Sequence, residues 1–266
     1  MVYSPYAGFM GSDSNVVYIE SPLSIDPSLP QLKRPPWLTD FKKQIGPPIQ
    51  ATPNSRRYPA PSSQDPLTIF RPMTNACSVP ASRWVNIGSD DLATVLIFTD
   101  GAALNNGQPN ARAGCGIVFI PATPSSRPKG VSFSLEAHDG LPTSNRAELL
   151  AAINALTLRV WIGEGFARIT IATDSEYVVR GICEYVFSWK KMNWKTSRGT
   201  PVVNRDLWET LFRAVERWES SGVMVQFYLI KREFNREADR LAKEAAVRTF
   251  LLPCEYAFII YAQEKD

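Results

Sequence analysis

Residues 95–100, Val-Leu-Ile-Phe-Thr-Asp, form an apolar run that closes on an acid and decides the fold. The same arrangement recurs at residues 169–174, Ile-Thr-Ile-Ala-Thr-Asp. Short apolar runs of this kind are typical of buried strands. Functional sites of open α/β sheets lie at the carboxyl ends of their strands. The two runs therefore predict strands that present Asp100 and Asp174 where such a sheet places its site.

Two further acids open helical patterns. Glu148 lies in 145–150, Asn-Arg-Ala-Glu-Leu-Leu, and Asp239 lies in 237–242, Glu-Ala-Asp-Arg-Leu-Ala. Several acids gathered at one place repel each other, which costs stability unless a cation lies between them. Because Mg²⁺ prefers hard oxygen ligands, the four acids predict a divalent-metal site.

Hydrophobic periodicity divides residues 91–250 into strands and helices. Strands are predicted at 93–99, 114–121, 131–137, 168–173 and 223–230. Helices are predicted at 145–161, 176–188, 206–220 and 235–250. Three strands at hairpin spacing, followed by alternating helices and strands, predict an α/β fold. Its five-stranded mixed sheet has three antiparallel strands, then parallel strands, and is flanked by helices.

The residues on either side of this region differ from it in composition. Of the 21 prolines, 14 lie at or before Pro80, and proline sustains neither helix nor central strand. Residues 1–90 are therefore predicted to be a Pro-rich, largely irregular arm, mostly disordered or extended, whose Pro-rich stretches could recruit protein partners. Residues 251–266 form a separate C-terminal extension.

Bulk composition narrows the class of protein. The 266 residues are 44% hydrophobic, enough for a buried core, and the net charge of +3 is too weak by itself to indicate nucleic acid. Residues 180–205, however, carry six basic side chains against the single acid Glu184. The four cysteines contain no Cys-x-x-Cys pair, which disfavours a zinc site or a disulfide framework. Without a signal peptide, a mitochondrial presequence or a membrane-length apolar run, we expect no membrane association and a nuclear or cytoplasmic location.

Four short motifs occur in an order and spacing that resemble type 1 ribonuclease H. They are Thr-Asp-Gly at 99–101, Asn-Arg-Ala-Glu at 145–148, Thr-Asp-Ser at 173–175 and Asn-x-x-Ala-Asp-x-Leu-Ala at 235–242. The block at 189–197, Trp-Lys-Lys-Met-Asn-Trp-Lys-Thr-Ser, resembles the basic protrusion of that family. The resemblance covers roughly residues 93–248. It implies a monomeric endonuclease that cleaves the RNA strand of RNA–DNA hybrids.

The same resemblance implies a catalytic set and a substrate-binding set. The carboxylates Asp100, Glu148, Asp174 and Asp239 would hold two Mg²⁺ ions, or Mn²⁺, one activating water and the other stabilising the leaving 3′-oxygen. Asn106 matches a contact to 2′-hydroxyl groups, by which proteins distinguish RNA from DNA. The other implied contacts, mostly to the DNA strand, are Thr143, Ser144, Asn145, Tyr185, Trp189, Lys190, Lys191, Ser197 and Asn204.

One element of the family is missing. A flexible loop with a histidine normally precedes the last helix, but residues 230–235 here read Ile-Lys-Arg-Glu-Phe-Asn. The only histidine, His138, follows the third predicted strand and is expected to be a surface residue. Arg232 or Glu233 could replace the missing side chain, although a guanidinium is a poor proton shuttle near neutral pH. We therefore expect slower activity, or activity that is relatively better with Mn²⁺.

The sequence also allows two other functions. A hybrid-binding module could keep the basic channel after losing catalysis, but such a relic has no reason to keep four mutually repelling acids. A different metal nuclease on a similar sheet, such as an integrase or a proofreading exonuclease, would lack the tryptophan–lysine block.

Overall fold

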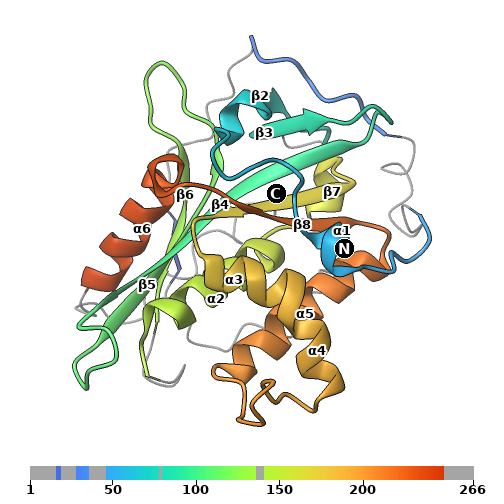
Figure 1. The fold of residues 1–266 in the computed structure, drawn as a ribbon. Coiled ribbons are helices and arrows are strands. Elements are labelled where there is room, and N and C mark those ends of the chain that lie inside the picture. The colour runs from blue at the N-terminus through green and yellow to red at the C-terminus, as the bar shows by residue number, and fades with distance from the viewer. Residues whose placement is uncertain (1–15, 19–27, 36–45, 78–79, 136–140, 249–266) are drawn as a thin grey trace, which may run out of the picture.

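The computed structural model describes residues 16–18, 28–35, 46–77, 80–135 and 141–248. They form one eight-stranded mixed sheet with helices on both faces (Figure 1). The expectations for His138 and for residues 251–266 lie outside the described residues. Within the described part of the chain, no helix combines the length and apolar character needed to span a membrane.

The centre of the sheet is the long strand β4 (Ala93–Leu104). It pairs in antiparallel fashion with β5 (Arg112–Ile120), which pairs in turn with β6 (Lys129–Ser134). On its other edge β4 is parallel to β7 (Arg168–Thr173), and β7 is parallel to β8 (Met224–Leu229). The five predicted strands and their mixed directions are confirmed.

The predicted number of strands is wrong, because the arm adds three: β1 (Val16–Tyr18), β2 (Arg71–Thr74) and β3 (Ser82–Ile87). β3 pairs with the first residues of β4, on the edge that β5 occupies further along. β2 ends this path of the sheet, where a strand can contain Pro72 because one of its edges needs no backbone donor. The density of prolines concealed strands that long-range pairing stabilises.

Buried contacts fasten this part of the arm to the sheet. Arg83 of β3 is buried and donates hydrogen bonds to Glu164, from Nε at 2.8 Å and from Nη2 at 3.1 Å. Phe70 and Trp84 belong to an apolar cluster on the sheet, in which the Trp84 and Phe98 rings meet edge to face, 5.2 Å apart. Residues 66–77 and 80–87 are therefore part of the folded unit rather than irregular chain.

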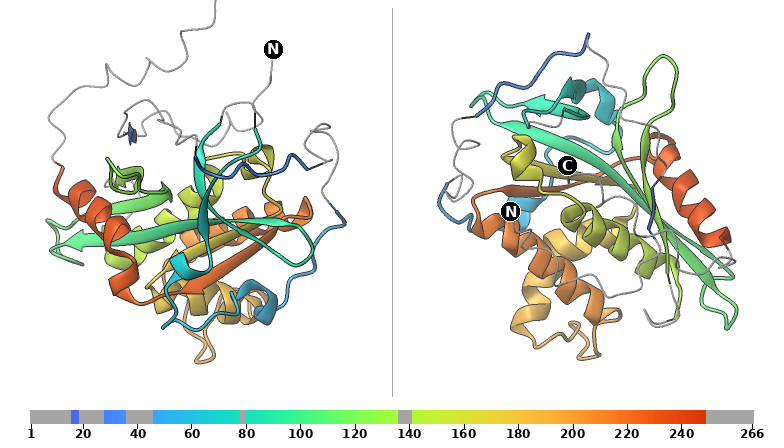
Figure 2. Two further views of the ribbon diagram at one scale, coloured as in Figure 1. Left: turned by 90° about the horizontal axis from the view of Figure 1, so that it is seen from above. Right: turned by 180° about the vertical axis from the view of Figure 1, so that it is seen from behind.

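Two helices cover opposite faces of β4 and β5. They are α2 (Ser144–Thr157) and α6 (Arg236–Val247), and Figures 1 and 2 show α6 across the sheet from α2. A side chain on Gly116 would strike the backbone of α6, whereas the neighbouring Cys115 thiol contacts the Ala147 carbonyl oxygen of α2. Because successive residues of a strand point to opposite faces, this alternation places one helix on each side.

The remaining helices lie on the α2 side. α3 (Glu176–Arg180) continues through the π-helical turn η5 (Gly181–Tyr185) into α4 (Val186–Lys191), and α5 (Arg205–Ser220) packs beside them. A Cβ on Gly181 would lie 2.0 Å from the Trp208 ring, so only glycine allows this packing. Single π turns within helices often mark functional segments.

Short elements complete the description: α1 (Pro53–Arg56), η2 (Pro66–Thr68), η4 (Trp161–Glu164) and η6 (Arg232–Phe234). Just after α1, the Tyr58 amide donates to the Phe227 carbonyl oxygen of β8 at 3.0 Å. The arm thus also lies along the β8 edge of the sheet.

Candidate active site

The four predicted acids come from four elements that meet where β7 ends beside β4. The predicted end of the first strand at residue 99 is wrong, because pairing with β5 extends β4 to Leu104, beyond Asp100. Asp100 lies on β4, Asp174 follows β7, Glu148 lies in the early part of α2 and Asp239 lies on α6. A Cβ on Gly101 would lie 2.2 Å from the Glu148 backbone nitrogen, so α2 abuts the strand directly beside Asp100. The fold therefore brings together acids that are far apart in the chain.

Two uncharged side chains position these acids. Asn235, only 1% exposed, donates from Nδ2 to Asp174 Oδ1 at 2.6 Å and to the Thr99 carbonyl oxygen at 3.0 Å. Ser175 Oγ donates to Glu148 Oε2 at 2.6 Å. Neither residue was among the predicted site residues, although each lies within a quoted motif. The only sequence signal for their role was proximity to the acids: Ser175 directly follows Asp174, and Asn235 lies one helical turn before Asp239.

The acids are electrostatically coupled. The pKa of Asp100 is raised to about 8, mainly by burial and next by the charge of Asp174, with smaller contributions from Asp239 and Glu148. The Gly101 amide, which donates to Asp100 at 2.8 Å, acts in the opposite direction. Burial and the Asp174 charge also raise the pKa of Glu148, against the hydrogen bond from Ser175. The cluster thus disfavours its own full ionisation.

Basic side chains at the rim offset part of this repulsion. Arg232 Nη2 contacts Asp239 Oδ1 at 2.8 Å, and Lys243 Nζ contacts Asp239 Oδ2 at 2.7 Å. The pKa of Arg232 is raised mainly by Asp239, with further contributions from Asp174 and Asp100. With 71% of its side chain exposed, Arg232 can leave this position readily. Of the two residues considered for the missing histidine, Arg232 thus faces the acids.

The donor set suits a divalent cation. All four acids offer hard oxygen ligands, and their mutual repulsion is what a bound cation relieves. Among the described residues, however, no three His, Cys, Asp or Glu side chains are already arranged to hold an ion. Side-chain rotations would therefore have to accompany binding.

The predicted contact to RNA lies at the start of α2. Asn106, which is exposed, accepts a hydrogen bond at Oδ1 from the Ser144 amide at 3.2 Å. Thr143 is the N-cap of α2 and accepts from the Arg146 amide at 3.3 Å. Asn145, also exposed, follows on the first turn. These polar groups share one surface at a helix N-terminus, which favours anions.

Arg146 connects this surface to Asn204. Its Nη1 lies 3.4 Å from Asn204 Oδ1, and its guanidinium forms an ion pair with Asp206 at 2.6 Å. Asn204 occupies the left-handed region with φ of 58°, which asparagine tolerates, and donates to the Tyr177 hydroxyl at 3.1 Å. Arg146 and Tyr177 are positioning residues that the sequence did not single out.

A line of aromatic rings runs from Asn204 towards α4. Ring centroids are separated by 5.2 Å for Tyr177–Trp208, 5.3 Å for Trp208–Trp189 and 5.7 Å for Trp189–Tyr185. Tyr185 is exposed and Trp208 fully buried, so the line passes from surface to core. The predicted aromatic pair, Tyr185 and Trp189, therefore packs through Trp189 against the buried ring of Trp208.

The predicted basic contacts occupy different environments. Lys190 forms an ion pair with Glu216 at 3.2 Å and lies over the Phe212 ring, 3.8 Å from its centroid. Lys191 and Ser197 are exposed, Ser197 in the turn between Thr196 and Gly199. Lys191 is therefore more available to a phosphate than Lys190.

Comparison with known proteins finds a matching family model and several similar proteins. The family model for RNase H matches residues 93–247. Ribonuclease HI of Vibrio parahaemolyticus is 40% identical over 153 residues, which cover 57% of this chain and 89% of that relative. Ribonuclease H of Treponema pallidum is 32% identical over 166 residues, covering 59% and 92%. Among solved structures, a type 1 RNase H with the type 2 active-site motif is 27% identical, with a TM-score of 0.43 and coverage of 57% and 72%.

Proposed function

We propose, from the premise that this chain belongs to the type 1 ribonuclease H family, that it hydrolyses the RNA strand of RNA–DNA hybrids with two divalent metal ions. The observation that carries the proposal is the cluster around Asp100, whose pKa of about 8 reflects burial and three neighbouring carboxylates. Catalysis is assigned to residues 91–250, with the strands of the arm completing the sheet.

The chain's own residues have distinct tasks in this reaction. Asp100, Glu148, Asp174 and Asp239 would hold Mg²⁺ or Mn²⁺. When bound, such ions lower the pKa of water and stabilise a leaving oxygen. Asn235 and Ser175 keep Asp174 and Glu148 oriented through their hydrogen bonds of 2.6 Å.

Arg232, which contacts Asp239, would stand in for the missing loop histidine as a cation but not as a proton carrier. Its guanidinium stays charged near neutral pH, so it neutralises phosphate charge without carrying a proton. Glu233 instead forms an ion pair with Lys231 at 3.5 Å. We therefore infer slower turnover than such a histidine would allow, or activity that is relatively better with Mn²⁺.

Substrate recognition uses the surfaces on either side of the acids. Asn106 would contact 2′-hydroxyl groups of the RNA strand. Thr143 and Asn204, joined through Arg146, would hold a phosphate of the DNA strand. Tyr185 and Trp189 offer ring faces to the deoxyriboses. Only a hybrid satisfies both surfaces.

The test compares strand-labelled RNA–DNA, RNA–RNA and DNA–DNA duplexes, first with Mg²⁺ and then with Mn²⁺. We expect the wild-type protein to cleave only the RNA of the hybrid, and Asp174→Asn to lose this cleavage. Asp90→Asn is the matched control, because Asp90 is exposed and forms an ion pair with Arg168. If wild type binds the hybrid but cleaves nothing with either metal, the chain is a binding module. Cleavage of duplex DNA would indicate a different metal nuclease.

A further inference from the structure

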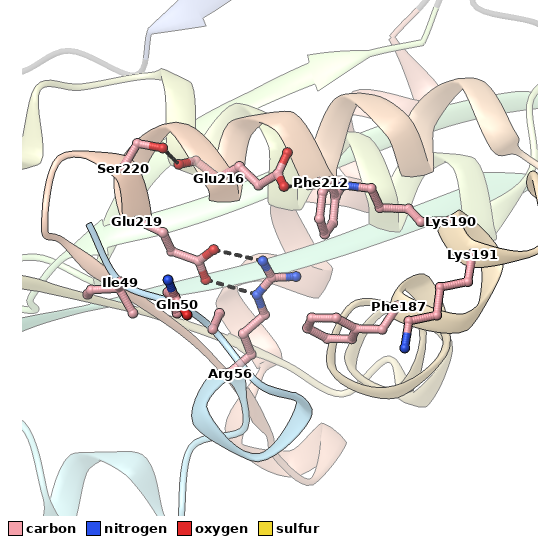
Figure 3. A pocket seen from close by; sticks show the side chains of 11 residues that line it. Ile49, Gln50, Arg56, Phe187, Lys190, Lys191, Phe212, Glu216, Glu219 and Ser220 are labelled. Atoms are coloured by element: carbon pink, nitrogen blue, oxygen red, sulfur yellow. Dashed lines mark hydrogen bonds and ion pairs between the residues drawn. The ribbon is translucent and has the colours of Figure 1, made fainter.

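A second concave site lies on the side of the basic helix α4 where the arm passes. It has a volume of about 630 Å³ and is bordered by residues 49–51 and Arg56 of the arm, by α4 and by the end of α5 (Figure 3). This volume is typical of sites for small organic ligands. The arm residues that border it precede the part of the chain that matches the family, residues 93–247.

Arg56 lines this pocket and is only 2% exposed. Its Nε and Nη2 donate to the two carboxylate oxygens of Glu219 at 2.9 Å and 2.7 Å. Its third nitrogen, Nη1, is buried and has no hydrogen-bond partner among the described residues. Figure 3 shows this nitrogen directed away from Glu219, on the side of the rings of Phe187 and Phe212. Each ring centroid lies 4.9 Å from the guanidinium carbon.

The charges around the pocket leave a positive excess. Both acids in its lining are engaged, Glu219 with Arg56 and Glu216 with Lys190 at 3.2 Å. Lys191 also borders the pocket, is exposed and forms no ion pair with a described residue. A buried donor without an acceptor is costly. The arrangement therefore favours an anionic group that accepts from several donors.

We propose that this pocket is a second binding site, for a phosphate group, either free phosphate or a terminal phosphate monoester. A phosphate offers three acceptor oxygens at once to the Arg56 and Lys191 donors, and the apolar walls (Ile49, Ala51 and the phenyl rings) leave room for an attached nucleoside. The source is inorganic phosphate or the 5′-phosphate of a short RNA. Only the RNA source rests on the proposed function. Hydrolysis that breaks the bond between phosphorus and the 3′-oxygen leaves a 3′-hydroxyl on one RNA product and a 5′-phosphate on the other.

The test is calorimetric titration of the metal-free protein in EDTA, so that it is independent of catalysis. The titrants are inorganic phosphate, a 5′-phosphorylated ribodinucleotide and the same dinucleotide with a 5′-hydroxyl. We expect saturable binding of the phosphorylated dinucleotide, weakened about tenfold in Lys191→Gln, which removes one charge-assisted contact. Lys195→Gln is the matched control, because Lys195 is exposed in the same basic segment but does not line the pocket.

Several outcomes decide the proposal. Equal weakening by Lys191→Gln and Lys195→Gln, equal affinity for the two dinucleotides, or no saturable binding of any phosphate would each overturn it. Binding of inorganic phosphate but not of the dinucleotide would support the site and exclude RNA ends as its ligand. Arg56→Lys should also weaken binding. If that variant does not fold, the pair of lysine variants still gives the answer.

Discussion

Replacing Asp100 with asparagine should stabilise the metal-free protein. Asp100 is 7% exposed, and its pKa is raised from 3.8 to about 8 in the folded state. Between these two pH values the folded protein keeps a proton that the unfolded chain has released. The free energy of unfolding therefore falls as the pH rises through this window. The difference between a pKa of 3.8 and one of about 8 means that ionised Asp100 destabilises the folded state by at most about 6 kcal/mol above pH 8.

The neutral Asp100→Asn side chain has nearly the same shape and removes this penalty. Because the acids can turn towards solvent and relieve part of the repulsion, we expect a gain of about 2–4 kcal/mol at pH 8 and almost none near pH 4. Urea unfolding in EDTA at pH 5, 6, 7 and 8 measures both the gain and its pH dependence. With Mg²⁺ added, wild type should gain stability and the variant should gain less.

Asp90→Asn should change the free energy of unfolding in the opposite direction under the same conditions. The hydrogen bond from Arg168 lowers the pKa of Asp90 to about 2, so its charged form favours the fold above the unfolded pKa. Neutralising Asp90 should therefore reduce stability slightly at pH 8. Two results would contradict this prediction: an Asp100→Asn protein no more stable than wild type at pH 8, or a decline between pH 5 and pH 8 as steep in the variant as in wild type. A smaller decline should remain, because burial also raises the pKa of Glu148.

Two further predictions concern the arm and the aromatic surface. Arg56→Met should lower the free energy of unfolding by about 3–5 kcal/mol, because it leaves Glu219 buried without its partner. Urea unfolding measures this, and a loss no larger than that of the exposed-pair variant Arg57→Met would contradict it. Trp189→Ala should raise KM for the hybrid more than it lowers kcat, because the ring contacts Tyr185 and Trp208 rather than the acids. Steady-state kinetics on a labelled hybrid tests this, and a fall in kcat with unchanged KM would count against it.

The sequence determined the central architecture because its signals are local. Apolar runs that end on Asp100 and Asp174 predicted β4 and β7, and helical spacing predicted α2, α5 and α6. The order of the motifs indicated the family that the comparisons identify. In each case a pattern within about twenty residues contains the physical cause of the element.

The arm could not be predicted in this way. β3 is stabilised by pairing with β4 and by the contact of Trp84 with Phe98, neither of which leaves a trace in its own segment. Proline counts indicated irregular chain because an edge position for Pro72 is a property of the whole sheet. Arg56 and Glu219, 163 residues apart, form an ion pair that no local pattern announces.

The same distinction applies to the site. The sequence by itself identified the four acids to which we assign the chemistry, since their type and spacing are local properties of the chain. Only the tertiary structure decided that Asn235 orients Asp174, that Arg232 faces Asp239 and that Asp100 resists ionisation. These properties depend on burial and on the distances between charges, and both are set by the packing of elements that lie far apart in the chain.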